Sequence, residues 1–308
     1  MRLFSYDDPD EGLSIGLIDA AERIVPLPAY SLSAELFQED GLADLRRQLK
    51  PLAGSVGLDR SSLQPLPAVE PGKIVCVGLN YRDHVAEGAG REAPEWPLLF
   101  AKFANTVIAD GEPIVRPEGT HALDLEVELG VVIGRAVRRV PVERAMDYVA
   151  GYVVVNDVSA RDWQGNKAAL REGEKGDGQW LRAKGSDTFL PMGPVFVTSD
   201  ELDPAAGIRL RSWRIPGPAR PGSGEAQPMQ DGTTADMIFS IPELVAFISR
   251  HITLDPGDVI ATGTPSGVGV FRDPPIFLEP GDRVRCEIDG IGSVENPIID
   301  WTDDPRDD

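Results

Sequence analysis

Hydrophobic and polar positions alternate over short stretches at the start of the chain, which is typical of β-strands. The apolar stretches lie at residues 3–6, 13–18 and 24–27, and acidic or Gly/Pro segments separate them. Strands this short with turn residues between them predict a small antiparallel meander.

A helix and a linker follow the predicted meander. Ser33 is a plausible N-cap for a helix that runs towards Gln48, and Pro51 would end it. The next segment has few periodic apolar positions and three closely spaced prolines, Pro65, Pro67 and Pro71. Such a composition is typical of a linker. We therefore expect a small N-terminal α/β domain over residues 1–69.

The pattern changes beyond residue 70 to longer, mostly apolar runs rich in β-branched residues. These runs predict strands at residues 74–79, 125–134, 148–159 and 193–199. Helical periodicity is confined to residues 81–88, 141–147 and 242–251. Two turns share the sequence Pro-Gly-Asp, at residues 255–258 and 279–282, and this order predicts type II turns. The pattern as a whole indicates an α+β fold in which β-structure dominates.

Charge and composition limit the kinds of partner that the protein can bind. The chain has 30 Lys+Arg and 50 Asp+Glu, a net charge of −20, which argues against nucleic acid or an anionic membrane as partner. No apolar run reaches the roughly 18 residues of a membrane span, and the acidic start is unlike a signal peptide. The two cysteines, Cys76 and Cys286, lie in apolar runs and are expected to be reduced. We expect a cytoplasmic protein.

Acidic residues occur where two predicted buried strands begin or end. Asp124, Glu126 and Glu128 alternate along one strand and so share a face. Asp157 follows the apolar run of the next strand. Buried carboxylates need a cation or hydrogen-bond donors, and oxygen ligands without Cys or His suit Mg²⁺ or Mn²⁺. The alternative is a solvated strand face with alternating charges.

Other polar residues could take part in chemistry. His84 and Glu87 are three residues apart in a predicted helix, so the carboxylate could orient the imidazole as a general base, or the two could form a surface pair. Lys102 and Lys184 lie among apolar and small residues, where each could bind a substrate carboxylate or extend to solvent. The glycine-rich segment 261–269 lacks a nucleotide-binding pattern but could present backbone N–H groups and Thr264 to an anion.

Seven motifs occur in an order that closely resembles the fumarylacetoacetate hydrolase family. They are GLNYRDHVAE, FAKF, LDLEVELGVVIG, NDVSARDWQ, AKGSDTFLPMGP, MQDGTTADMIFS and LDPGDVIATGTPSGVG. The resemblance covers roughly residues 70–300. It implies a catalytic domain over residues 70–301 with a mixed β-sandwich roll, usually as a homodimer, and leaves residues 302–308 as an acidic tail.

The resemblance also implies an active site with one Mg²⁺ or Mn²⁺ ion. The family's metal ligands would fall on Glu126, Glu128 and Asp157, with Asp124 as a neighbour. Its other site residues divide into a catalytic group and a substrate-binding group: His84, Glu87, Lys184 and Gln164 in the first, and Lys102, Arg161 and Thr264 in the second. The polar segment 165–179 lengthens the usual spacing after Gln164, so either Gln164 or Gln179 could face the substrate.

The implied activity is hydrolysis of a C–C bond in an acylpyruvate-type substrate, through a metal-bound enolate and with His84 and Glu87 activating water. Decarboxylation of oxaloacetate and isomerisation of 2-hydroxyhepta-2,4-diene-1,7-dioate use the same metal site and are alternatives. A hydrolase or dehydratase of 2-keto-3-deoxy sugar acids is another. A non-catalytic protein that binds a metal or ligand is the most distant one.

Overall fold

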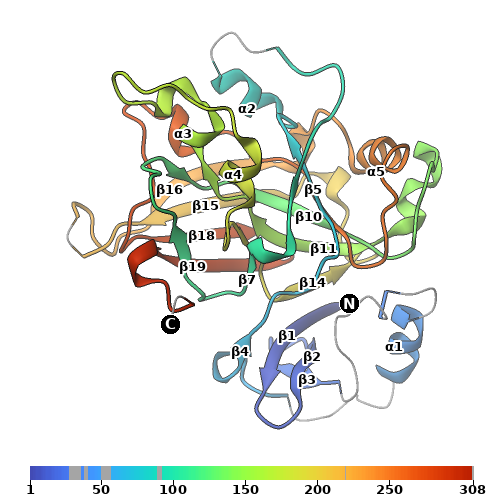
Figure 1. The fold of residues 1–308 in the computed structure, drawn as a ribbon. Helices are drawn as coiled ribbons and strands as arrows, with labels where there is room; N and C mark the ends of the chain where they lie inside the picture. Colours follow the sequence, from blue (N-terminus) through green and yellow to red (C-terminus); the bar gives the residue numbers. More distant parts are fainter. Residues whose placement is uncertain (28–35, 38–40, 50–56, 89–91, 219, 307–308) are drawn as a thin grey trace.

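The computed structural model describes residues 1–27, 36–37, 41–49, 57–88, 92–218 and 220–306. Two large β-sheets and two small ones form most of the fold, and short helices cover their ends (Figure 1). The α+β class with dominant β-structure is therefore confirmed. No helix in the described part of the chain is long and apolar enough to cross a membrane.

The larger sheet has ten strands in the order β3-β2-β1-β14-β11-β10-β17-β5-β6, with β4 paired to β1 beside this path. Its strands are β1 (Arg2–Asp8), β2 (Gly12–Ile18), β3 (Ile24–Pro26), β4 (Gln64–Pro65), β5 (Ile74–Gly78), β6 (Leu98–Lys102), β10 (Val127–Ile133), β11 (Val149–Asn156), β14 (Val195–Thr198) and β17 (Val259–Ala261).

The second sheet has five strands in the order β16-β15-β18-β19-β8. They are β8 (Ile114–Arg116), β15 (Arg209–Ile215), β16 (Gln227–Thr233), β18 (Arg283–Ile288) and β19 (Gly292–Asp300). Two small two-stranded sheets pair β9 (Leu123–Asp124) with β12 (Ser159–Ala160), and β7 (Val107–Ile108) with β13 (Leu190–Pro191).

The α-helices are short, and three of them gather on one side of the sheets. Figure 1 shows α2, α3 and α4 there, with β1–β3 and α1 at the opposite end. The α-helices are α1 (Gly41–Leu49), α2 (Arg82–Glu87), α3 (Arg161–Gln164), α4 (Trp180–Gly185) and α5 (Ile241–Ser249). The 3₁₀ helices are η2 (Arg60–Ser62), η3 (Ala104–Thr106), η4 (Val142–Tyr148), η5 (Lys167–Ala169), η6 (Pro204–Ala206), η7 (Thr234–Asp236), η8 (Gly269–Phe271) and η9 (Trp301–Asp303).

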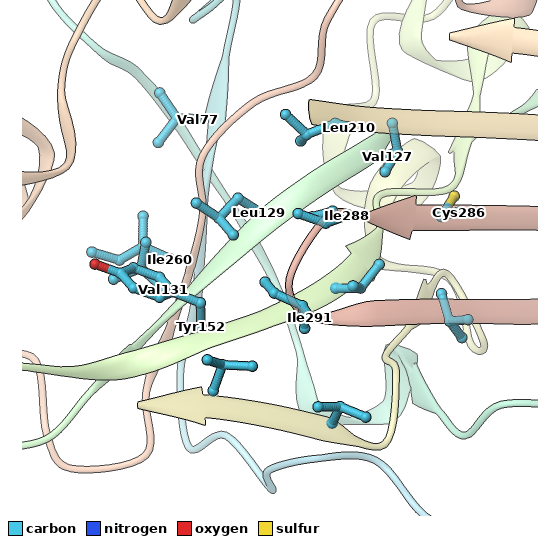
Figure 2. Packing of buried hydrophobic residues seen from close by; sticks show 14 of the residues in the cluster. Val77, Val127, Leu129, Val131, Tyr152, Leu210, Ile260, Cys286, Ile288 and Ile291 are labelled. Carbon is cyan, nitrogen blue, oxygen red and sulfur yellow. The ribbon is translucent and has the colours of Figure 1, made fainter. Parts of the chain in front are cut away.

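The main hydrophobic core lies between the two large sheets. Figure 2 shows Val127 and Leu129 of β10 near Leu210 and Ile288 of the second sheet. Every residue of β10 is buried, because β11 and β17 flank this strand on both edges and other elements cover both faces. A strand covered on both faces is mostly apolar instead of alternating, which explains the apolar run from Leu129 to Ile133.

The structure agrees with most elements that the sequence predicts and differs at a few. The segment predicted as helix over 141–147 is the 3₁₀ helix η4. The predicted start of the first helix at Ser33 lies outside the described residues, and α1 begins at Gly41. Both Pro-Gly-Asp turns are type II, since Gly257 and Gly281 have φ of +88° and +91°.

The N-terminal strands extend the large sheet. β1 pairs antiparallel with β14, so the predicted meander of β1, β2 and β3 continues the sheet that contains β10 and β11. The domain boundary near residue 70 stays a prediction. What matters for function is that the ends of β10, β11, β5 and β6 lie beside the group of α2, α3 and α4 (Figure 1).

Candidate active site

Three carboxylates come together where β10 begins and β11 ends. Glu126 directly precedes β10, Glu128 is its second residue, and Asp157 directly follows β11. The two strands are antiparallel with Val127 opposite Asn156, so the start of one meets the end of the other. One oxygen of each carboxylate lies within 4.8 Å of the others, and all three side chains are buried. Among the described residues this is the one cluster with metal-ligand geometry.

Two lysines contact these carboxylates from different sides. Lys184 of α4 donates to Glu126 Oε2 at 2.6 Å and to Asp157 Oδ2 at 2.8 Å. Lys102, the last residue of β6, lies 2.8 Å from Asp157 Oδ1 and donates to the carbonyl oxygens of Val158 and Phe189. Both lysines are buried, so their charges are compensated by carboxylates and carbonyls and not by water.

Arg161 links the cluster to Asp124. Its Nε donates to Asp124 Oδ2 at 2.9 Å and its Nη2 to Glu126 Oε1 at 2.6 Å. Asp124 also accepts the backbone N–H groups of Gly269 and Val270. With its oxygens engaged by these donors, Asp124 is a neighbour of the cluster and not part of it.

Electrostatics within the cluster favour a further cation. Burial, together with the nearby charges of Asp157 and Glu126, raises the pKa of Glu128 well above its ordinary value. Burial also acts on Glu126, but Arg161 and Lys184 outweigh it and hold the pKa of Glu126 below its ordinary value. Because like charges and desolvation disfavour ionisation of Glu128, a divalent ion at this point would relieve both.

The donor set fits a hard divalent cation. Mg²⁺ and Mn²⁺ prefer carboxylate oxygens, and one oxygen from each of Glu126, Glu128 and Asp157 could reach one ion. Buried Asp157 Oδ1 accepts no hydrogen bond of good geometry, although Lys102 is near. These residues could therefore hold the metal that the sequence predicts.

Helix α2 carries the predicted dyad and is attached to the glycine-rich loop. His84 Nδ1 lies 3.1 Å from Glu87 Oε2, and Glu87 Oε1 accepts the backbone N–H of Gly267 at 2.5 Å. Asp83 accepts the N–H of Ser266 at 3.0 Å. Glu87 thus contacts Nδ1 of the imidazole while the loop holds its other oxygen, so Nε2 is the ring nitrogen of His84 that could exchange a proton.

A cavity of about 270 Å³ joins these groups. Its polar wall consists of His84, Glu126, Glu128, Arg161, Gln164, Asn166, Lys184 and Thr264. Its apolar wall includes Val77, Leu79, Leu98, Phe100, Trp180 and Phe271. A dyad, a carboxylate cluster and two cations around one small cavity can bind an anionic substrate and move a proton on it.

Not all predicted site residues line the cavity. Gln164 does, whereas Gln179 is exposed and outside the lining. Lys102 lies outside the lining, and its ammonium contacts Asp157 instead. Thr264 lines the cavity, but its hydroxyl donates to Val127 O and accepts from Gln230 Nε2.

Sequence reasoning did not identify the apolar wall, Asn166 or Gln230. Trp180 and Phe100 come from α4 and β6, and their rings lie 5.5 Å apart, edge to face. Gln230 accepts the N–H of Val127 at the start of β10 and so supports the carboxylate strand from the second sheet. Its motif, MQDGTT, was visible in the sequence, but its role depends on the packing of the two sheets.

Comparisons with known proteins agree with this geometry. The family model described as "Fumarylacetoacetate (FAA) hydrolase C-terminal" matches residues 73–299. The chain is 39% identical over 308 residues to "Oxaloacetate tautomerase fahd2, mitochondrial" of Xenopus laevis, covering 97% of this chain and 90% of that protein. It is 42% identical over 305 residues to a "Putative hydrolase" of Burkholderia cenocepacia, covering 95% and 96%.

A solved structure shares the whole fold. It is the crystal structure of "5-carboxymethyl-2-hydroxymuconate delta-isomerase" from Mycobacterium smegmatis, with a TM-score of 0.73 and 34% identity. The match covers 97% of this chain and 99% of that one. The similarity therefore includes the N-terminal strands as well as the region around the cavity.

Proposed function

Because this chain belongs to the fumarylacetoacetate hydrolase family, we propose that it catalyses metal-dependent keto–enol tautomerisation of a 2-oxo dicarboxylic acid, with oxaloacetate as the main substrate. One observation carries this: His84, whose Nδ1 contacts Glu87, lines the same cavity as Glu126 and Glu128. The similarity to an oxaloacetate tautomerase over nearly the whole chain supports this substrate. Among the activities that the sequence implied, enol chemistry without hydrolysis thus has the better support.

Substrate binding needs a local positive centre in an acidic protein. Asp124, Glu126, Glu128 and Asp157 bring four negative charges when ionised, and Lys102, Arg161 and Lys184 bring three positive ones, a net of 3 − 4 = −1. A divalent cation held by Glu126, Glu128 and Asp157 would supply Lewis-acid polarisation of the substrate's 2-oxygen. Lys184 lies on the cavity wall beside these carboxylates and would stabilise negative charge on that oxygen.

His84 would carry the proton. In the direction from enol to keto form, a proton is added to C3 and another leaves the 2-hydroxyl, so no water is consumed and no C–C bond breaks. Glu87 holds Nδ1 of His84, so Nε2 is the atom that exchanges the proton with C3. Phe100, Trp180 and Leu98 form the apolar wall and limit the access of water to the reacting atoms.

A second candidate is isomerisation of a 2-hydroxy-dienedioate. It moves a proton between carbons through the same enol chemistry and needs the same base. The observation that favours it is the similarity over the full fold to a structure whose title names a hydroxymuconate isomerase. Hydrolysis of an acylpyruvate would use His84 on water instead of carbon, and a decarboxylase would release CO₂.

Product analysis by NMR separates these reactions. We would incubate the purified protein with Mg²⁺ or Mn²⁺ and, in turn, enol-oxaloacetate, an acylpyruvate and a 2-hydroxymuconate-type diacid. The proposal predicts faster ketonisation of oxaloacetate than metal alone gives, with no pyruvate formed. Release of pyruvate from the acylpyruvate at a higher kcat/KM would establish the hydrolase and overturn the proposal.

We further propose that the enzyme is a homodimer that works in the cytoplasm. The family resemblance supports the dimer, and the two free, buried cysteines are consistent with a reducing compartment. Light scattering after gel filtration tests the first part, with a mass near twice 33.3 kDa expected. A monomeric mass would contradict it.

A further inference from the structure

Two side-chain amides lie on the cavity wall where the insertion 165–179 begins. Gln164 is the last residue of α3, and Asn166 caps the 3₁₀ helix η5 inside the insertion. Both line the cavity, as do Phe100 and Leu98. Asn166 lies outside the sequence motifs that identify the family.

The carbonyl oxygen of each amide is already used by a protein donor. Gln164 Oε1 accepts from Arg161 Nη1 at 3.2 Å, and Asn166 Oδ1 accepts the backbone N–H of Ala168 at 3.1 Å. A guanidinium and a backbone N–H can only donate, so they fix which end of each amide faces them. The NH₂ groups of both amides are therefore left to donate hydrogen bonds to a ligand in the cavity.

Backbone packing holds Asn166 in this place. Gly165 has φ of +85°, and a Cβ on it would lie 3.3 Å from Gly178 N, while a Cβ on Gly176 would lie 2.6 Å from Gly165 Cα. The two ends of the insertion thus meet through glycines at close range. The N–H of Asn166 also donates to Arg161 O at 3.0 Å, which ties the start of the insertion to α3.

We propose that Asn166 is a specificity-determining residue that binds the distal carboxylate of a dicarboxylate substrate, together with Gln164. The inference rests on the proposed function and deepens it, since it names the groups that would select a dicarboxylate over a 2-oxo acid with an apolar tail. Arg161 is engaged by Asp124 and Glu126, so neutral amide donors are the groups left for a second carboxylate at this end of the cavity.

Binding of two unreactive ligands tests the inference without turnover. Malate and lactate share the 2-hydroxy acid group, and only malate has the distal carboxylate. Calorimetry with Mg²⁺ present gives the ratio of their dissociation constants for the parent and for Asn166→Asp. The Asp side chain still accepts the Ala168 N–H but places a negative charge where the amide donates.

We expect Asn166→Asp to weaken malate binding roughly 10- to 100-fold and lactate binding by less than about 2-fold. Ala168→Asp is the matched control, because it adds the same charge to the same turn at an exposed position, and it should leave the ratio unchanged. An equal loss for both ligands, or no loss for either, would overturn the inference.

The same variants separate this inference from the proposed function. If the parent binds malate more tightly than lactate and Asn166→Asp removes the preference, the inference holds even where oxaloacetate is not tautomerised. If oxaloacetate is tautomerised and Asn166→Asp keeps the parent's ratio of malate to lactate binding, the inference fails and the proposed function stands.

Discussion

Lys102 Nζ lies 2.8 Å from Asp157 Oδ1, and both side chains are wholly inaccessible to solvent. The lysine also donates to the carbonyl oxygens of Val158 and Phe189, so it joins the end of β6 to the segment after β11. Lys184 contacts the other oxygen of Asp157 from the cavity side. Lys102 therefore contacts Asp157 on the side away from Lys184. It holds the Asp157 carboxylate where that carboxylate can bind a cation.

Replacing Lys102 by Met should destabilise the metal-free protein by about 3–5 kcal/mol, because it leaves a buried carboxylate with one fewer cation. It should also weaken Mg²⁺ binding, since Asp157 is no longer fixed. Urea unfolding in EDTA and in Mg²⁺ measures both effects. The control is Lys175→Met, at an exposed position, where a change of about 0.5 kcal/mol or less is expected. Equal effects of the two variants would contradict this role of Lys102.

The raised pKa of Glu128 predicts that the stability of the fold depends on both pH and metal binding. Its pKa is raised in the folded, metal-free protein, so the folded state binds the proton more strongly than the unfolded state does. Stability is therefore lost as the pH rises from the pKa of Glu128 in the unfolded chain, about 4.3, towards its higher pKa in the folded protein. Glu128→Gln removes this loss, so in EDTA the variant should become more stable than the parent as pH rises above about 5.

Metal addition should reverse that order. Mg²⁺ should stabilise the parent by binding the ionised carboxylate of Glu128, and binding should release a proton. The neutral amide that Glu128→Gln introduces is a poor ligand, so the variant should gain almost nothing from Mg²⁺. Thermal unfolding of the parent and the variant at pH 5 and pH 8, with and without Mg²⁺, provides the four values needed for each protein. An equal gain from Mg²⁺ in both proteins would show that Glu128 is not a ligand.

Glu87→Gln should lower kcat by about 10²- to 10⁴-fold while Mg²⁺ affinity stays nearly unchanged. Glu87 accepts from Gly267 N–H through one oxygen, so the new amide NH₂ must face His84 Nδ1 and make that atom an acceptor. The proton then moves to Nε2, where the base is needed. Steady-state kinetics with a Mg²⁺ titration measures both quantities. A kcat near that of the parent would show that Glu87 does not orient His84 for catalysis.

Gly267 presents its N–H to Glu87 only because it is glycine. It has φ of +104°, and a Cβ there would lie 2.1 Å from Met229 O. Gly267→Ala should therefore displace the loop and reduce both stability and kcat. Gly111→Ala is the matched control, because φ is +87° with no atom within 4 Å of the added Cβ. It should cost about 1–2 kcal/mol of stability and no activity, and a similar loss of activity in both would contradict the role of Gly267.

The sequence predicted the elements whose signal is local. Strand β10 is apolar apart from Glu128, and Glu126 directly precedes it, so its burial and two of the three clustered carboxylates could be inferred from residues 124–133. The resemblance to a family supplied the partners of that cluster from distant segments, and Glu126, Glu128 and Asp157 do lie together.

Other features could not be predicted because they depend on packing between distant segments. The position of Lys102 beside Asp157, outside the cavity lining, follows from the way β6 ends next to the residues that follow β11. The pairing of β1 with β14 joins residues almost 200 positions apart. The fold of the insertion places Gln164 on the cavity wall and leaves Gln179 exposed, which the sequence alone could not show.

The most direct test of the proposed function is exchange of the C3 hydrogens of oxaloacetate with D₂O, followed by NMR in the presence of Mg²⁺. Enolisation at C3 by His84 predicts that the parent accelerates exchange over Mg²⁺ alone, and that His84→Ala removes at least about 100-fold of that acceleration while still binding Mg²⁺. Exchange by His84→Ala at the parent's rate, or no acceleration by the parent, would contradict the proposal.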